Sequence, residues 1–343
     1  MSVATIYSER MFRRFETDLG PCADKLRIPR AIFREPDFEL SIDKYYRLLD
    51  CASRTTNPRI GLTIGSGMEA GDLGPLGHAA AASADVRQML GVLSRYLYVF
   101  AHSNVLRIDV GPRLFAVAYD VTDSNIAMHQ QDVELALAYA VRQIRALTGT
   151  EASPRIVEFA HAQPAYAKDL RKFFGGEMQF GRGGNRLHYS RNVLDLPIHS
   201  SDPSLLHALE IFLSERLKVR SEDADLGKKV VHLISTSLSS GMPEIGRIAA
   251  TLGLSGRTLQ RHLQDESLVF SEMVESVRRD IAEQYVQRSD FSLTDIALML
   301  GYSELSAFSR AFRRWTGSSP QQARGSEPAT TPRRRSHRAA ASA

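Results

Sequence analysis

The C-terminal third of the chain contains an internal repeat, and this repeat constrains the fold more than any other feature. Residues 248–255 (IAATLGLS) return 48 positions later as residues 296–303 (IALMLGYS). The stretch 259–263 returns 49 positions later as 308–312, so the second copy carries one extra residue. A repeat of this length indicates one supersecondary unit that is used twice.

Each copy of the repeat predicts two short helices joined by a tight turn. Gly253 and Gly301 follow the first helix, where glycine permits the positive φ that a turn after a helix requires. Ser255 and Ser303 come next, and serine is a preferred N-cap of a new helix. The apolar positions of the second helix face inward and leave an outer face of arginine, glutamine and serine. This order is that of a helix-turn-helix.

A plain αα-hairpin is the alternative interpretation of a single unit. Two copies, each with an arginine at the matching place of the outer face, favour DNA binding instead. Between them, residues 270–288 predict a linker helix with one apolar stripe. At about 1.5 Å per residue this helix spans roughly 27 Å. It can therefore hold two recognition helices about one DNA turn, ~34 Å, apart, so that a monomer reads two successive major-groove segments.

The charge distribution limits how such a chain can bind DNA. The net charge is +4, with +2 in residues 1–220, −1 in residues 221–324 and +3 in residues 325–343. The helical region is therefore not basic overall. DNA binding must depend on a basic face of that region rather than on its total charge.

Composition and missing motifs exclude several other classes of protein. Hydrophobic residues make up 43% and charged residues 24%, a balance typical of globular proteins. The two cysteines, Cys22 and Cys51, form no CxxC pair, which argues against a zinc site and a disulfide framework. No apolar run is long enough to span a bilayer, and no GxGxxG, GxxxxGK[ST], HExxH or GxSxG motif occurs. We expect a cytoplasmic protein that is not an enzyme and has no cofactor, metal or membrane partner.

The periodicity predicts two domains. Residues 1–220 mix an amphipathic helix over 86–100 and a strongly apolar helix over 132–147 with β-rich runs at 105–110 and 114–121, which indicates an α+β domain. The glycine-rich stretch 65–77 is predicted to be a loop. The remaining boundaries are a polar linker over 221–225, an all-α domain of two helix-turn-helix units over 226–324, and a disordered basic tail over 325–343.

The helical region resembles the AraC/XylS family of bacterial transcription regulators. The resemblance rests on residues 248–263, on Arg278 and Ala282 of the linker helix, on 296–312, and on Gly317-Ser318-Ser319-Pro320. Tyr285 departs from the family, which often has leucine at this position. Residues 60–62, 74–77, 95–96, 159–161, 173–175 and 196–197 carry a second resemblance. Through them, residues 1–220 are similar to the arabinose-binding-type effector and dimerisation domain of one branch of the family. That second resemblance suggests a cupin-like β part.

The resemblance implies a sequence-specific activator with double-stranded DNA and RNA polymerase as partners, and with a small-molecule effector and a second copy of the chain as further candidates. It also implies which side chains contact DNA. The residues that face base edges are expected to be Arg257, Gln260 and Arg261 in the first unit and Leu305, Ser306, Ser309 and Arg310 in the second, while Thr258, Arg313 and Arg314 contact phosphate.

Two other functions stay open on the sequence alone. One is an enzyme fused to a DNA-binding domain, such as an alkyl-transfer repair protein, although two cysteines far apart in the sequence argue against it. The other is a DNA-binding protein whose N-terminal domain only dimerises. His161 either lines an effector pocket or is a hydrogen-bonded structural histidine, and the second interpretation is favoured.

Overall fold

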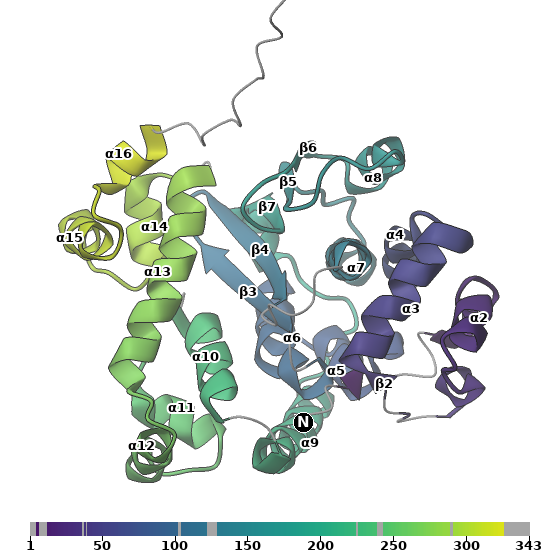
Figure 1. Ribbon diagram of the computed structural model, residues 1–343, viewed down its shortest axis with the longest axis horizontal. Helices are drawn as coiled ribbons and strands as arrows, with labels where there is room; N and C mark the ends of the chain where they lie inside the picture. Colours follow the sequence, from purple (N-terminus) through teal and green to yellow (C-terminus); the bar gives the residue numbers. More distant parts are fainter. Residues whose placement is uncertain are drawn as a thin grey trace, which may run out of the picture.

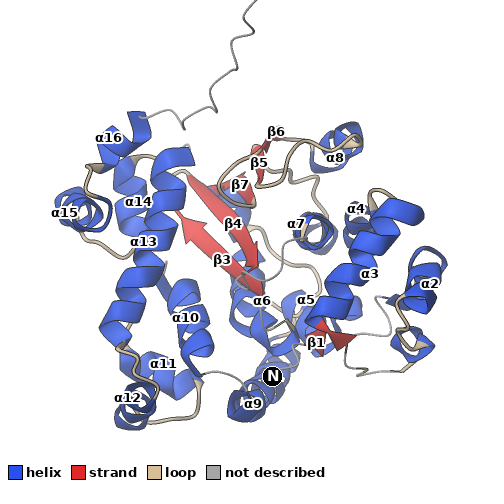
Figure 2. Ribbon diagram, viewed as in Figure 1, coloured by secondary structure: helices blue, strands red, loops and turns tan. Residues whose placement is uncertain are grey.

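The computed structural model describes residues 5–6, 12–35, 38, 40–101, 104–121, 129–223, 226–238, 243–288 and 291–325. Its N-terminal part combines helices with two sheets, and its C-terminal part is helical (Figure 2). The strands are β1 Thr5–Ile6, β2 Leu40–Ser41, β3 Asn104–Val110, β4 Leu114–Val121, β5 Ile156–Phe159, β6 Glu177–Phe180 and β7 Arg186–Ser190.

The helices of the N-terminal domain are α2 Glu16–Lys25, α3 Ile42–Thr55, α4 Ile60–Gly67, α5 Gly74–Ala81, α6 Val86–Phe100, α7 Gln130–Thr148, α8 Ala167–Phe174 and α9 Pro203–Asp223, with short 3₁₀ turns η1 Arg30–Phe33, η2 Ala70–Leu73 and η3 Arg191–Asp195. Those of the C-terminal domain are α10 Leu226–Ser237, α11 Ile245–Thr251, α12 Gly256–Asp265, α13 Phe270–Arg288, α14 Leu293–Met299, α15 Leu305–Thr316 and α16 Pro320–Gly325.

A five-stranded sheet in the order β3-β4-β7-β5-β6 forms the centre of the N-terminal domain. The β5–β6 pair is parallel and the other pairs are antiparallel. Side chains alternate between the two faces, as the pleat of a strand requires. Phe115 and Val117 of β4 belong to the core of the N-terminal domain, whereas Ala116 packs into the core of the C-terminal domain. The sheet therefore lies between α7 on one side and α13 on the other (Figure 1).

The face of the sheet that meets the C-terminal domain carries buried charges. Arg107 Nε lies 3.1 Å from both oxygens of Asp109. Arg186 is fully buried, donates to Glu158 at 3.1 Å, and donates across the domain boundary to Gln284 of α13 at 2.9 Å. These pairs compensate charges that would be costly to bury alone.

Tyr285 of α13 is the centre of this domain interface. Its side chain is fully buried, and its hydroxyl donates a hydrogen bond to Asp109 of β3. The Arg186 guanidinium carbon lies 4.4 Å from the centroid of its ring, within the range of a cation–π contact. Phe291 packs beside Tyr285 and His188, with ring centroids 5.6 and 5.5 Å away. The interface therefore combines apolar packing with ionic contacts.

The stretch predicted to be a glycine-rich loop is helical instead. It contains the end of α4, then η2 and α5. A Cβ on Gly61 would lie 2.0 Å from the Gln131 carbonyl oxygen, and one on Gly65 would lie 2.2 Å from that of Leu135. These glycines let α4 approach the backbone of α7 more closely than any other residue would permit. The loop prediction was wrong because it read the glycines as turn formers.

The α+β class of the N-terminal domain and the helical class of the C-terminal domain are confirmed. The cupin-like expectation is wrong, since a cupin is a double-sheet jelly roll, whereas the described residues form an open five-stranded sheet covered by helices and a separate two-stranded pair, β1 and β2. The predicted linker over 221–225 begins as helix, because α9 continues to Asp223. The predicted tail lies outside the described residues from 326 onward.

Candidate nucleic-acid interface and ligand pocket

The first repeat unit consists of α11 and α12. Gly253 in the turn has a φ of 70°, and the Leu254 amide donates to the Ala249 carbonyl at 2.8 Å. The Ser255 side chain caps α12 by accepting a hydrogen bond from the Thr258 amide at 3.1 Å. Leu259 and Leu263 are buried, so the opposite side of α12 faces outward.

The second unit, α14 and α15, reproduces this turn. Gly301 has a φ of 75°, and the Tyr302 amide donates to Ala297 at 2.9 Å. The predicted cap at Ser303 is wrong, because Glu304 is the N-cap of α15 and its side chain makes no capping hydrogen bond. The extra residue of the second copy moves the beginning of the helix one position along the chain.

The linker helix α13 separates the two units. It has 19 residues and therefore spans about 28 Å. Figure 1 shows α12 and α15 near the two ends of α13, both at the margin of the molecule away from α2–α4. The Arg278 guanidinium carbon lies 4.7 Å from the ring centroid of Tyr302, which ties α13 to the turn of the second unit.

The proposed base-contacting residues lie on the outer sides of α12 and α15. Those that are exposed are Arg257, Gln260, Arg261, Ser306 and Arg310, together with Arg313 among the phosphate contacts, whereas Thr258, Leu305 and Ser309 are half-buried. The four exposed arginines make no ion pair with another described residue. Arg314 differs from them, because it pairs with Glu275 of α13. These two faces form an accessible basic surface on a domain that has no net positive charge.

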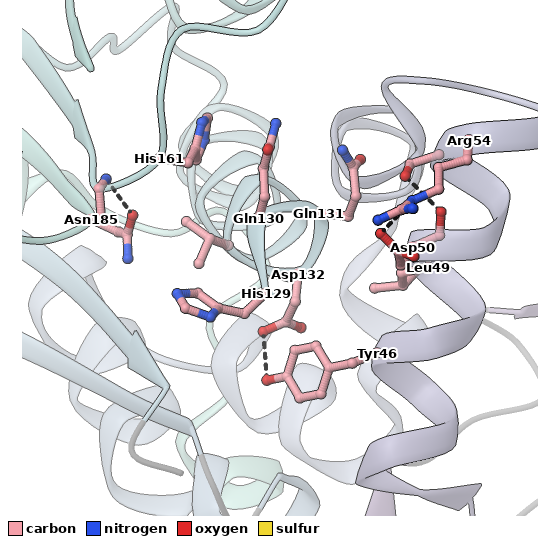
Figure 3. Close-up of a pocket in the computed structure, with 13 residues that line it drawn as sticks. Tyr46, Leu49, Asp50, Arg54, His129, Gln130, Gln131, Asp132, His161 and Asn185 are labelled. Atoms are coloured by element: carbon pink, nitrogen blue, oxygen red, sulfur yellow. Dashed lines mark hydrogen bonds and ion pairs between the residues drawn. The ribbon is translucent and has the colours of Figure 1, made fainter. Parts of the chain in front are cut away.

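A second candidate site is a polar pocket of about 470 Å³ in the N-terminal domain, between α3, the beginning of α7 and the ends of β5 and β7 (Figure 3). Asp50 accepts a hydrogen bond from Arg54 at 3.1 Å on one side of the pocket. Asn185 lies on the other side, where its side-chain oxygen Oδ1 accepts a hydrogen bond from the Ala160 amide at 2.9 Å. The labelled side chains that line the pocket between them are His129, Gln130, Gln131, Asp132 and His161.

His161 is hydrogen-bonded and also lines this pocket. Its Nδ1 is 2.9 Å from the Ala162 carbonyl oxygen, and the side chain also lines the pocket. Its Nε2 lies 3.4 Å from Glu134, whose carboxylate is fully buried. Burial lowers the pKa of His161 and raises the pKa of Glu134 to about 7, although Gln130 and Tyr166 donate hydrogen bonds to that carboxylate. Burial therefore favours the neutral form of each group.

The two cysteines lie close together, although 28 residues separate them in the sequence. Packing of α2 against α3 brings Cys22 beside Cys51. Burial raises the pKa of the Cys22 thiol, which is opposite to what a nucleophilic cysteine requires. Among the described residues, no group of three metal-ligating side chains comes together. This region gives no support to the repair-enzyme alternative.

Sequence reasoning missed Asp132 and the charged domain interface. Asp132 was assigned only to the beginning of an apolar helix, yet it is buried in the wall of the pocket. The available signal was a pair of carboxylates, Asp132 and Glu134, in the first turns of an otherwise apolar segment.

No helix of the described residues is both long and apolar enough to cross a membrane.

Comparison with known proteins accounts for both parts of the chain. Residues 17–198 match the family described as the arabinose-binding domain of AraC transcription regulator, N-terminal, and residues 248–326 match a helix-turn-helix domain family. The HTH-type transcriptional regulator VirS of Mycobacterium tuberculosis is 32% identical over 92% of this chain and 93% of its own length. The ornithine utilization regulator of Pseudomonas aeruginosa is 25% identical over 88% of this chain and 89% of its own length. The crystal structure of the regulator CdpR from P. aeruginosa aligns with 93% of this chain and 99% of its own, at 21% identity and a TM-score of 0.46.

Proposed function

Because the chain belongs to the AraC family of DNA-binding transcription regulators, and is therefore not an enzyme, we propose that it is an activator that responds to a small molecule and reads two successive major-groove segments. The observation that carries this proposal is the placement of α12 and α15, each of which follows a glycine turn, near the two ends of the 19-residue helix α13. A spacing near one DNA turn suits two contacts on the same side of a duplex.

Individual roles follow from the chemistry of the side chains. Arg261 and Arg310 suit the O6 and N7 atoms of guanine, and Gln260 suits N6 and N7 of adenine. Arg257, Ser306 and Ser309 contact the neighbouring base edges, and Leu305 packs on a thymine methyl. Thr258 and Arg313 contact phosphate, which orients the protein without reading sequence.

Arg310→Ala tests the second recognition helix. Loss of a bidentate guanine contact should weaken operator binding by about 1–3 kcal/mol and relax specificity at one position. The measurement is a binding titration at one salt concentration against operator and scrambled DNA, with the operator taken from genome-wide mapping of bound DNA. Arg314→Ala is the matched control: that arginine is paired with Glu275 and was expected to contact only phosphate, so its loss should leave the preference for operator over scrambled DNA unchanged. An equal loss of affinity for both DNAs would assign Arg310 to phosphate instead.

We place the effector in the N-terminal domain. The support is the polar pocket beside Asp132 and His161, which is large enough for a small metabolite. A metabolite panel in a thermal-shift assay tests this role, because an effector raises the melting temperature with its concentration. If no compound shifts the melting temperature, the alternative is a domain that only dimerises.

We also propose that the chain forms a homodimer through α9. Among the described residues, five large apolar side chains are strongly exposed, and Leu205, Ile211 and Phe212 of α9 are three of them, at 45%, 54% and 42%. Such clustering is typical of a protein–protein interface. Phe212→Glu should convert a dimer to a monomer in analytical ultracentrifugation, whereas Val269→Glu, at an equally exposed apolar residue elsewhere, should leave it dimeric.

Activation is tested by transcription with purified RNA polymerase from a promoter beside the mapped operator. We expect the protein to increase transcript yield from that promoter. A decrease would make the protein a repressor.

A further inference from the structure

A mainly apolar cavity of about 90 Å³ lies inside the N-terminal domain, between α6 and α7 and over β3 and β4. Its walls come from Leu93 and Leu97 of α6 and from Leu135, Ala136 and Ala140 of α7. Leu97 and Ala136 are only half-buried, so they lie where the cavity approaches the protein surface. The apolar part of such a cavity can accept an apolar group.

The polar end of this cavity is formed by Asp132, which also lines the pocket in Figure 3. Its Oδ2 accepts hydrogen bonds from Asn104 at 3.0 Å and Tyr119 at 2.9 Å. The single hydroxyl proton of Tyr46 is shared between this oxygen and Asn104 Oδ1, each 3.2 Å away. Asp132 Oδ1 accepts one, from Tyr45 at 2.7 Å, within the described residues. Because a carboxylate oxygen has two lone pairs, Oδ1 keeps capacity for another donor.

Asp132 lacks the partner that a buried carboxylate usually has. Its side chain is 3% exposed, yet no arginine or lysine of the described residues forms an ion pair with it. Burial raises the pKa of Asp132 and outweighs the tyrosine hydroxyls and His129 of the same pocket, which lower it. A buried carboxylate with no arginine or lysine partner is costly, and a cation supplied from outside would stabilise its charged form.

Tyr139 adds a second unsatisfied group to the wall of the same cavity. It is 6% exposed, and its buried hydroxyl has no hydrogen-bond partner among the described residues. Buried hydroxyls normally find a partner, so one without a partner beside a cavity points to a ligand that would supply it.

We propose that this cavity takes a small amine with an apolar body, whose ammonium group donates to Asp132 Oδ1 and whose hydrocarbon part lies among the leucines and alanines of α6 and α7. This proposal rests on the effector role of the N-terminal domain. An anion is disfavoured by the carboxylate at the polar end, and the cavity volume limits the apolar part to about one ring or a short branched chain. Any further polar groups of the ligand would extend into the pocket of Figure 3.

Three probes of nearly equal size separate the chemistry from the shape. Benzylamine, benzyl alcohol and toluene are titrated into the full-length protein at neutral pH and followed by calorimetry and thermal shift. We expect saturable binding of benzylamine at least tenfold tighter than that of benzyl alcohol or toluene. Benzylamine binding that is absent, or no tighter than toluene binding, overturns the proposal.

Two variants locate the binding. Asp132→Asn should remove the preference for the amine, and Ala136→Leu, which fills the cavity from its half-buried side, should abolish binding of all three probes. Ala146→Leu is the matched control, because Ala146 lies on the same helix but is exposed and outside the cavity. If Asp132→Asn fails to fold, Ala136→Leu still tests whether the probes bind in this cavity. Unchanged benzylamine binding in Ala136→Leu refutes the site.

Failure of the amine assignment can be distinguished from failure of the effector role of the N-terminal domain. If benzylamine binds at Asp132 but no amine changes operator affinity, the ligand class stands and the effector role fails. If a metabolite of another class shifts both the melting temperature and operator affinity while amines do not bind, the effector role stands and the amine assignment fails.

Discussion

Replacement of Tyr285 by phenylalanine measures how firmly the two domains are joined. The variant keeps the ring that contacts Arg186 and Phe291 and removes only the hydroxyl that donates to Asp109. A hydrogen bond to a charged group contributes about 1.5–3 kcal/mol to stability. Asp109 keeps Arg107 as a partner at 3.1 Å, so no charge is left unpaired. We expect the free energy of unfolding to fall by about 1.5–3 kcal/mol.

The assay is urea unfolding followed by two probes. Trp315 is the one tryptophan of the chain and reports on the C-terminal domain, while circular dichroism reports on all helices. In the parent protein the two transitions should coincide, and Tyr285→Phe should shift the Trp315 transition to lower urea. Tyr189→Phe is the control, because that tyrosine is equally buried but its hydroxyl has no partner among the described residues. Equal midpoints for the two variants would refute a stabilising interface at Tyr285.

Three further predictions concern stability. Gly61→Ala should destabilise the chain by about 1–3 kcal/mol, because the added Cβ would overlap the Gln131 carbonyl. Gly91→Ala has open space around its Cβ and should stabilise α6 by about 0.5–1 kcal/mol. Thermal unfolding of the two variants checks both values. The pKa of Glu134 is about 7 in the folded protein and 4.5 in the unfolded chain. Between these pH values the folded state binds more protons than the unfolded state, so stability falls as the pH rises. Urea unfolding at several pH values should show this fall in the parent protein and not in Glu134→Gln. Ser292→Ala should cost about 1 kcal/mol, because Ser292 belongs to the capping box of α14.

Local patterns of the sequence were sufficient to predict several elements of the fold. The amphipathic period gives α6 over Val86–Phe100 as predicted, and α7 contains the predicted helix 132–147 and is followed by Gly149, which has a φ of 63°. The repeat predicted both helix-turn-helix units, because each turn is stabilised by its own glycine and an adjacent backbone hydrogen bond. These features depend on residues within a few positions of each other.

The site was predictable only in part. The outward faces of α12 and α15 follow from helical periodicity, since burial of Leu259 and Phe308 determines which side chains face outward. The wall of the ligand cavity does not follow from any such period. Asp132, Asn104 and Tyr119 are brought together from α7, β3 and β4, and nothing local marks them as neighbours.

The sequence by itself determined the repeat, the helix and strand periods, and the alternation of charged with apolar residues along β3, β5 and β7. Alternation alone would leave Arg107 and Arg186 on a solvent-facing side of the sheet. Only the tertiary structure decided that α13 covers this face and that Tyr285 contacts it. The reason is physical: side-chain period depends on the local backbone, whereas burial of a sheet face depends on which distant surface complements it in shape and charge.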